Sequence, residues 1–455
     1  MSGWLNDLST LLGTSCVSAE EAVLSQHSTD KWLASAEPQA VVFAESTEQV
    51  SALMRFASER KIPVTPRGAG VGYVGGCVPL RGGIALSLAR MNLILEINVE
   101  DGVAVVQPGV ITGTLQNAVK ERGWFYPPDP ASLKDCSLGG NIATNAGGPR
   151  CLKYGVTRHY ILGLEAVLAD GTILRAGGRC HKNKTGFDLI GIFTGSEGLL
   201  GIVTEATLRI IPHPPMRAMI SAGFASFPAA AAAVQKILGS GHLPSALEIS
   251  DRFTLQAARD CLGDSVPQGE AHLLVEVDGQ TDAVPLEIAA LVKLLNQLHA
   301  VSVSTGLGDA ECEKFWQLRR EFSSSLRATG LTKLNEDIVV PRGKLVELVS
   351  FAEQLQNEYG FPVACFGHAG DGNIHVNIMV QDLTDTAQRE RAETALDRLF
   401  QYVLALGGAI TGEHGIGIAK RRWFASAIGE GALEVHRRIK AALDPLGILN
   451  PGKFV

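Results

Sequence analysis

Two histidines on a predicted hairpin form the most distinctive chemical pattern in the sequence. His368 closes an apolar run that begins at residue 363, and His375 lies in an alternating run that continues to residue 380. The connection Ala-Gly-Asp-Gly predicts a tight turn, and the period of two places His375 and Asn377 on one face. Such a turn can bring His368 beside His375, and paired imidazoles are common ligands of one divalent metal ion. The alternative is that both histidines only satisfy buried hydrogen bonds.

A further acid and histidine stand between glycines in residues 411–417, at Glu413 and His414. This loop could supply a third ligand to the same metal ion. The sequence therefore predicts a metal site from two segments about forty residues apart, with alternatives open for each histidine.

Three glycine clusters form the second chemical signal, at residues 67–79, 137–148 and 188–204. Gly70, Gly72 and Gly75 match the spacing of a dinucleotide-binding loop, but Gly76 and Pro79 follow where such a loop must open a helix. This difference excludes a Rossmann domain and leaves a loop whose backbone N–H groups cradle phosphate. Three clusters within about 140 residues predict one long ligand wrapped by backbone.

The composition excludes several classes of protein. A chain of 455 residues is expected to form two or three domains. A formal net charge of −7 argues against a nucleic-acid partner. The sequence contains no run of about 18 apolar residues, so no membrane span is expected. The eight cysteines stand singly and form no Cys-x-x-Cys pair, so no iron–sulfur or zinc-ribbon site is expected.

The secondary-structure pattern changes at the proline-rich residues 212–215. Before it, short strands alternate with helices, and hairpins are expected across residues 98–102 and at the Asp-Gly of residues 170–171. Beyond it, helices are expected at 227–238, 283–299, 310–328, 344–359, 386–406 and 430–443. Strand-like runs separate them, so the second half is typical of an α+β domain.

Four motifs carry a resemblance to a known family. They are Pro66-Arg67-Gly68-Ala69-Gly70, Pro128-Asp129-Pro130-Ala131-Ser132, residues 139–148 and residues 195–203. With these motifs, residues 36–215 resemble the FAD-binding domain of the vanillyl-alcohol oxidase (PCMH) flavoproteins. Residues 216–455 resemble the FAD-linked oxidase C-terminal domain, in the branch of D-lactate dehydrogenase, D-2-hydroxyglutarate dehydrogenase and the flavin-binding subunit of glycolate oxidase. Residues 1–35 form an N-terminal helical segment in this division, and the implied fold class is α+β.

The resemblance implies FAD held noncovalently, since no histidine lies between Arg67 and Pro79 where some relatives attach the flavin. It assigns His368, His375 and Glu413 as ligands of a divalent metal, usually zinc or manganese. It also assigns His414 as the base, Arg319 as the grip on the substrate carboxylate, and Asn377 to the substrate lining. The implied FAD-binding residues are Pro66, Arg67, Gly68, Ala69, Gly70, Gly72, Gly75, Gly76, Pro130, Ser132, Gly139, Gly140, Asn141, Thr144, Asn145, Gly147, Gly148, Glu197, Gly198, Gly201, Ile202 and Val203.

The chain departs from the family pattern near the substrate. Relatives carry a lysine two residues before an aspartate, whereas Asn335 precedes Asp337 here and Lys333 lies two residues earlier. The doubled Arg319-Arg320 leaves the register of the carboxylate grip open.

The expected activity is oxidation of a D-2-hydroxy acid (D-lactate, D-2-hydroxyglutarate or glycolate) to the 2-oxo acid, with hydride transfer to flavin. A guanidinium can fork the carboxylate, the metal can orient the hydroxyl, and a histidine near neutral pH can accept its proton. The acceptor is expected to be an electron-transfer flavoprotein, a quinone or partner subunits. The alternative is a flavin-binding electron-transfer subunit of a multi-subunit complex. The sequence favours the cytoplasm and leaves peripheral attachment to the inner membrane and a homodimer open.

Overall fold

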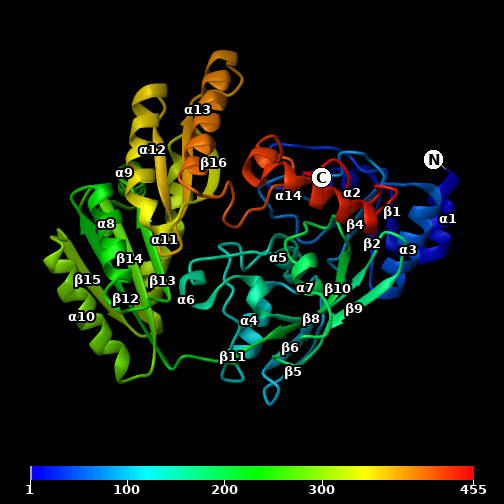
Figure 1. Cartoon of the computed structure of the whole chain (residues 1–455), viewed down its shortest axis with the longest axis horizontal. Helices are drawn as coiled ribbons and strands as arrows, with labels where there is room; N and C mark the ends of the chain where they lie inside the picture. The colour runs from blue at the N-terminus through cyan, green and yellow to red at the C-terminus, as the bar shows by residue number, and fades with distance from the viewer. Residues whose placement is uncertain (1–2) are drawn as a thin grey trace. The chain divides into compact units, whose positions relative to one another are not determined.

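The computed structural model describes residues 3–455, and the chain forms two compact units. The first unit contains residues 3–147, 156–213 and 413–455, and the second contains residues 148–155 and 214–412. Neither unit is a continuous stretch of sequence, since a short segment of the N-terminal half folds with the second unit and the C-terminal segment folds with the first. Figure 1 labels the elements by chain order.

The first unit begins with a small sheet in the order β1-β2-β4-β3. Its strands are β1 (Val17–Ser18), β2 (Ala40–Phe43), β3 (Val64–Arg67) and β4 (Ile84–Ser87), and β4 runs parallel to both β2 and β3. Helix α3 (Thr47–Arg60) connects β2 to β3, and the Ser46 hydroxyl caps it by accepting the N–H of Gln49. The alternation of short strands and helix is typical of a parallel βαβ connection.

A five-stranded antiparallel sheet follows in the order β5-β6-β10-β8-β9. Its strands are β5 (Ile94–Asn98), β6 (Val103–Val106), β8 (Ile161–Val167), β9 (Ile173–Gly177) and β10 (Ile202–Arg209). The pairs Asn98↔Val103 and Val167↔Ile173 confirm both predicted hairpins. The remaining α-helices and strands of this unit, among the described residues, are α1 (Gly3–Leu12), α2 (Glu21–Gln26), α4 (Thr112–Lys120), β7 (Trp124–Phe125), α5 (Leu138–Thr144), α7 (Leu189–Phe193), β11 (Ile211–Pro212) and α14 (Arg421–Leu443).

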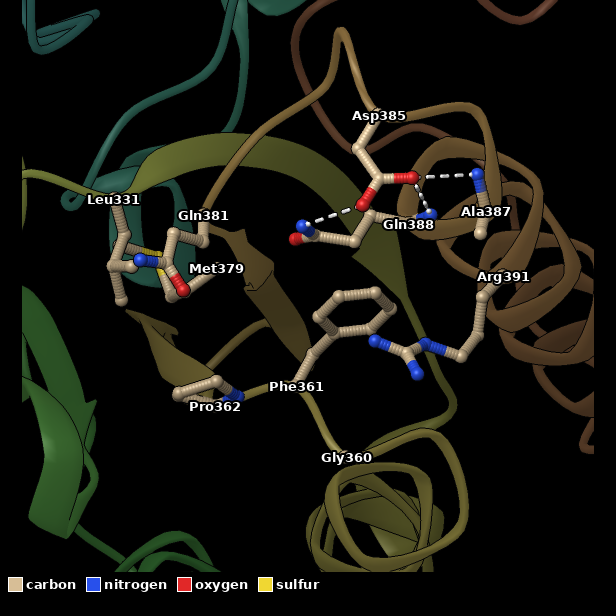
Figure 2. Close-up of a pocket in the computed structure, with 10 residues that line it drawn as sticks. All are labelled: Leu331, Gly360, Phe361, Pro362, Met379, Gln381, Asp385, Ala387, Gln388 and Arg391. Carbon is tan, nitrogen blue, oxygen red and sulfur yellow. Dashed lines mark hydrogen bonds between the residues drawn. The ribbon is translucent and has the colours of Figure 1, made fainter.

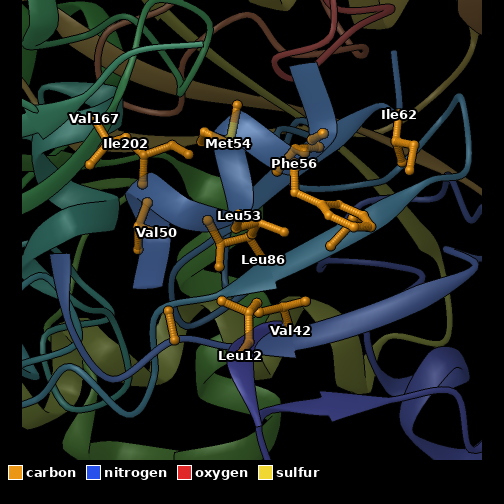
Figure 3. Packing of buried hydrophobic residues seen from close by; sticks show 14 of the residues in the cluster. Leu12, Val42, Val50, Leu53, Met54, Phe56, Ile62, Leu86, Val167 and Ile202 are labelled. Atoms are coloured by element: carbon orange, nitrogen blue, oxygen red, sulfur yellow. The ribbon is translucent and has the colours of Figure 1, made fainter. Parts of the chain in front are cut away.

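One apolar core joins the two sheets of the first unit. Leu53 and Met54 of α3 pack with Leu86 of the first sheet and with Val167 and Ile202 of the second (Figure 3). All five side chains are at most 2% exposed. Their burial removes apolar surface from water, the main stabilising effect in folding, and fixes the strands from which the glycine clusters extend.

The second unit is built on a seven-stranded sheet in the order β15-β12-β14-β13-β17-β18-β16. Every neighbouring pair is antiparallel. The strands are β12 (Met216–Phe224), β13 (Ala246–Ser250), β14 (Ala271–Gly279), β15 (Ser302–Leu307), β16 (Thr332–Val339), β17 (Val363–His368) and β18 (Asn373–Val380). The predicted β17–β18 hairpin is therefore confirmed.

Two groups of helices pack on this sheet. In the first group, α8 (Phe227–Leu238) contacts α10 (Ala283–Gln297) and α12 (Leu345–Tyr359), and α12 contacts α13 (Thr386–Ala405). In the second, α9 (Arg252–Leu262) packs against α11 (Asp309–Ala328). Short helix α6 (Cys151–Tyr154) contacts β13. Among the described residues, no helix combines the length and apolar character that crossing a membrane requires.

The predicted C-terminal helix at residues 430–443 is confirmed, and one helical segment before it was not predicted. Helix α14 begins at Arg421, and Gly429, with φ 78° and ψ 158°, separates this segment from the predicted one. Glycines at 429 and 431 weaken the helical pattern, but the chain resumes the helix after the kink. In the predicted N-terminal helical segment, the described residues 3–35 contain helices α1 and α2. They also contain strand β1, which was not predicted because its partner β2 is distant in sequence.

Candidate active site

The predicted histidines lie together on the β17–β18 hairpin. Both are buried, and their ring centroids are 5.5 Å apart. The hairpin closes this tightly because Gly372 has φ 77° and a Cβ there would lie 2.1 Å from the carbonyl oxygen of Val340. At Gly367, a Cβ would lie 2.6 Å from the carbonyl oxygen of Asn373. Glycine is therefore required at both positions.

Cross-strand register places the polar residues of this region on one face of the sheet. Residues directly opposite each other in a sheet share a face, and so do residues two apart on one strand. Phe366 pairs with both His375 and Ser250, which places His368 and Glu248 on the same face as His375. Asp337 pairs with His375 across the other edge of β18.

Glu248 of β13 connects His368 to Arg319. Its Oε1 accepts a hydrogen bond from Nδ1 of His368 at 2.5 Å, and its Oε2 accepts from Nε and Nη2 of Arg319 at 2.8 and 2.7 Å. The Glu248 side chain is 1% exposed. Burial alone would raise the pKa of Glu248, but the charges of His368 and Arg319 outweigh it and lower the pKa to about 2.

Arg319 and Arg320 point in different directions from α11. The Arg319 side chain is 12% exposed and lies against the sheet, whereas Arg320 is 50% exposed and pairs with Glu313. The guanidinium of Arg319 also lies 4.8 Å from the ring centre of Phe366. Of the two arginines, the structure therefore brings Arg319 to the histidines, with one edge of its guanidinium already bound by Glu248.

Asp337 binds the last two residues of the second unit, Thr411 and Gly412. It is fully buried, and its Oδ2 accepts hydrogen bonds from Thr411 Oγ1 at 3.0 Å and from the N–H of Gly412 at 2.8 Å. Glu413, the third predicted ligand, is the next residue and begins the last segment of the first unit.

Asn377 lies on the same sheet face and is fully buried. Its Nδ2 donates to the carbonyl oxygens of Ala364 and His375 at 2.9 and 3.0 Å. In residues 3–455, no hydrogen-bond partner is found for the buried Oδ1 atoms of Asn377 and Asn335. Lys333, on the same face of β16, donates to Ser323 Oγ at 3.1 Å, and burial lowers its pKa to about 8.

The three glycine clusters of the first unit contact one another. The Ser137 hydroxyl accepts the N–H groups of Ala69 and Gly140, which joins the first cluster to the second. The N–H of Glu197 donates to the carbonyl oxygen of Ala143 at 2.8 Å, which joins the second cluster to the third. The structure thus gathers segments that the sequence places up to 130 residues apart. Gly148 is the exception among the predicted FAD-binding residues, since it begins the segment 148–155 of the second unit.

Glu197 fixes the loop that carries His414. Its two carboxylate oxygens accept the N–H groups of Ile416 and Gly417 at 2.7 and 2.8 Å. Burial raises the pKa of Glu197 to about 7, against the opposing effect of these two N–H groups. The ring of Tyr73 lies 5.3 Å from that of His414. The sequence pattern Gly-Ser-Glu-Gly does not predict the contact of Glu197 with Ile416 and Gly417, because these residues are more than 200 positions away.

The segment 148–155 is held in the second unit by buried ion pairs. Arg150 donates to both carboxylate oxygens of Glu276 at 2.6 and 2.9 Å, and the Tyr154 hydroxyl donates to Asp278 at 2.8 Å. Glu276 also accepts from Nε1 of Trp316 at 2.6 Å. The sequence did not predict that residues 148–155 pack in the second unit, because no local pattern in this segment indicates which residues it contacts.

A cavity of about 530 Å³ lies elsewhere in the second unit (Figure 2). It is lined by Leu331, Gly360, Phe361, Pro362, Met379, Gln381, Asp385, Ala387, Gln388 and Arg391. The guanidinium of Arg391 lies 4.5 Å from the ring centre of Phe361. None of the predicted site residues lines this cavity.

Comparison with known families gives two matches. Residues 38–177 match the FAD binding domain, and residues 213–454 match the C-terminal domain of FAD linked oxidases. The glycolate oxidase subunit GlcD of Bacillus subtilis is 40% identical over 418 residues, which cover 92% of this chain and 89% of that protein. A D-lactate dehydrogenase of Anaerostipes hadrus is 34% identical, with 92% and 90% covered.

Solved structures share the fold at lower identity. The 4-ethylphenol oxidase from Gulosibacter chungangensis has a TM-score of 0.78 at 22% identity, with coverage of 99% of this chain and 96% of that one. p-Cresol methylhydroxylase gives a TM-score of 0.76 at 19% identity, covering 100% and 97%. These likenesses confirm the predicted two-domain α+β fold. Together with the family matches and the relatives, they show that the chain belongs to the FAD-linked oxidases and is an FAD-linked oxidoreductase.

Proposed function

We propose that the protein oxidises a D-2-hydroxy acid to the 2-oxo acid, using noncovalent FAD and a divalent metal ion, zinc or manganese. The carrying observation is the contact of His368, a candidate metal donor, with Glu248 and through it with Arg319. His368, which would bind the metal that orients the substrate hydroxyl, and Arg319, which would bind the substrate carboxylate, thus both contact the buried carboxylate of Glu248. Relatives named as a glycolate oxidase subunit and as D-lactate dehydrogenases support glycolate or D-lactate over the larger D-2-hydroxyglutarate.

The donor set fits a divalent metal. Two histidines and one glutamate form the nitrogen–oxygen ligand set common in catalytic zinc sites, and such sites keep a position open for substrate. His368, His375 and Glu413 would hold the ion. When bound, it would act as a Lewis acid that lowers the pKa of the substrate hydroxyl and orients it.

The glycine clusters fit FAD. Backbone N–H groups of closely approaching glycines can bind its pyrophosphate. When bound, FAD supplies the acceptor for two electrons and the α-hydrogen. In this chain the FAD-binding residues are proposed to be those of the three clusters.

The protein's own side chains have three roles in this proposal. Arg319 binds the substrate carboxylate through the guanidinium edge that Glu248 leaves unused. His414 accepts the proton of the α-hydroxyl as the C–O bond becomes C=O, and its ring contact with Tyr73 orients it. Asn377 places its buried amide oxygen toward the substrate hydroxyl or a water molecule.

Anaerobic flavin bleaching by a panel of D- and L-2-hydroxy acids tests the proposal. We expect D-lactate or glycolate to bleach the flavin, the L-lactate enantiomer to be inert, and chelation of metal to abolish bleaching. Bleaching at the full rate after metal removal would refute the metal's role. Failure of every 2-hydroxy acid, with FAD bound and metal present, would refute the substrate class.

An electron-transfer subunit of a multi-subunit complex is the second candidate, favoured because the Bacillus subtilis relative is named as a subunit of glycolate oxidase. The isolated chain would then reduce no artificial dye with any 2-hydroxy acid. Turnover with a dye by the purified chain favours the first candidate. Copurification of a cysteine-rich partner, with turnover only in its presence, favours the second and identifies the acceptor as a partner subunit rather than a quinone or an electron-transfer flavoprotein.

A further inference from the structure

A buried glutamate, Glu248, is central to the polar face of the second unit. It is 1% exposed, and both of its carboxylate oxygens are bound by side chains, Oε1 by His368 and Oε2 by Arg319. Sequence patterns gave no reason to select it, because it stands alone in an apolar strand and His368 is 120 residues away.

Burial of a charged pair is costly, and replacing one by apolar residues is often neutral or stabilising. A buried carboxylate that bridges two candidate functional side chains is therefore better explained by positioning than by stability. A second buried glutamate on the next strand, Glu276, offers a comparison. It also binds arginine, but its other partners are Trp316 and Ser245, and it does not touch a candidate metal ligand.

The contact with His368 determines which ring nitrogen can bind a metal. A neutral imidazole carries one N–H, and a carboxylate that accepts it at Nδ1 leaves the lone pair on Nε2. Metal-binding histidines commonly donate their other N–H to a carboxylate in this way, which fixes the ring and strengthens the donor. The Nδ1 of His375 lies 4.0 Å from Oδ1 of Asp337, which is beyond hydrogen-bond distance.

The contact with Arg319 determines which edge of the guanidinium can bind a substrate. A guanidinium is planar and donates along separate edges. Glu248 occupies the edge formed by Nε and Nη2. The edge that includes Nη1 then remains for an anion.

We propose that Glu248 is the positioning residue of this site, presenting Nε2 of His368 to the metal and the Nη1 edge of Arg319 to the substrate carboxylate. This inference rests on the proposed function and extends it. One side chain thereby sets the distance between the atom that orients the hydroxyl and the atom that binds the carboxylate. The two groups are adjacent in a 2-hydroxy acid, so a fixed spacing selects that substrate class.

Zinc affinity of the metal-free protein tests the first half of the inference. The variant Glu248→Gln keeps an oxygen acceptor but loses the charge, and Glu276→Gln is the matched control with the same change on the neighbouring strand. Competition with a chromophoric chelator is expected to show zinc affinity about 10–100-fold weaker in Glu248→Gln, the usual effect of removing such a partner. Glu276→Gln is expected to bind zinc within about twofold of the parent, with no carboxylate–histidine contact removed.

Equal zinc affinity in Glu248→Gln and the parent would overturn the inference while leaving the proposed metal intact. A parent that binds no zinc or manganese would instead refute the metal of the proposed function, and the inference with it. If Glu248→Gln does not fold, Glu248→Asp retains the charge and withdraws the carboxylate by one bond, about 1.5 Å. It is expected to weaken zinc binding in the same direction, and unchanged affinity there would also overturn the inference.

The KM for substrate tests the second half. Glu248→Gln is expected to raise KM more than it lowers kcat, because Arg319 contacts the carboxylate in both ground and transition states. Glu276→Gln is expected to leave KM near that of the parent. A Glu248→Gln protein with the parent's KM at saturating zinc would show that Glu248 does not orient Arg319.

Discussion

Replacing Gly415 with alanine is expected to displace the loop that carries His414. Gly415 has φ 88°, and a Cβ there would lie 2.6 Å from Oε1 and 3.0 Å from Cδ of Glu197. Glu197 cannot yield easily, because its carboxylate is buried and binds the N–H groups of the two residues that follow Gly415. The loop itself must therefore move.

The expected loss of stability has two parts. A left-handed backbone costs an alanine about 1–2 kcal/mol, and overpacking against Glu197 adds about 1–3 kcal/mol. The total is about 2–5 kcal/mol. Gly123, in the same unit, provides the matched control, since it has φ 75° and a Cβ there would meet nothing within 4 Å. Gly123→Ala is expected to lose only the first part.

Thermal unfolding and single-turnover flavin reduction measure the two consequences. Each kcal/mol corresponds to about 2–4 °C in Tm for a unit of this size. Gly415→Ala is expected to melt below Gly123→Ala and to reduce flavin about 10²-fold more slowly than the parent, the scale of a 1 Å misplacement of a catalytic group. Equal Tm values would show that Glu197 does not obstruct the alanine. A parent-like reduction rate in Gly415→Ala would show that the position of His414 does not matter.

Three other experiments test the flavin attachment, the roles of His414 and Arg319, and the protonation of a buried histidine. Acid precipitation is expected to release the yellow colour, because no histidine lies in the first glycine cluster, and colour in the pellet would refute noncovalent FAD. His414→Ala is expected to slow flavin reduction by about 10²–10⁴-fold, the usual cost of losing a general base, while Arg319→Ala raises KM and its surface neighbour Arg320→Ala does not. Burial, aided by the charges of Arg319 and Arg259, lowers the pKa of His272 to about 3. The unfolded chain then binds a proton below pH 6.5 that the folded chain does not, so stability falls by about 1.4 kcal/mol per pH unit from pH 6.5 toward 3. Urea unfolding of His272→Gln at several pH values is expected to show a shallower slope, and an unchanged slope would refute the assignment.

The hairpin could be predicted from sequence because its determinants are local. The alternating run, the glycine turn and the two histidines lie within eighteen residues, and the structure has both strands where they were expected. The family resemblance extended this reading to the domain order and to FAD. The metal site of His368, His375 and Glu413 stays a prediction, and within the second unit the two histidines lie together on the hairpin.

Residues that act through distant partners could not be predicted. Glu248 is the single acid of its strand, and Asp337 directly follows another acid in β16. Their partners come from other strands and from the end of the second unit. Glu197 was predicted as an FAD-binding residue from its glycine cluster, a prediction that stays open. Its carboxylate oxygens instead hold the backbone of Ile416 and Gly417.

In the second unit, the repeat of side chains along the strands and the repeat along helix α11 together bring the polar side chains into contact. The strand period of two places Glu276, Glu248 and His368 on one sheet face, although burying charge there costs stability. The helical period places Trp316 and Arg319 of α11 three residues apart, so that the first binds Glu276 and the second binds Glu248. A helix that packed by apolar contact alone would need neither acid. Trp316 and Arg319 therefore lie on the face of α11 that packs over the sheet, whereas Arg320 lies on its exposed side.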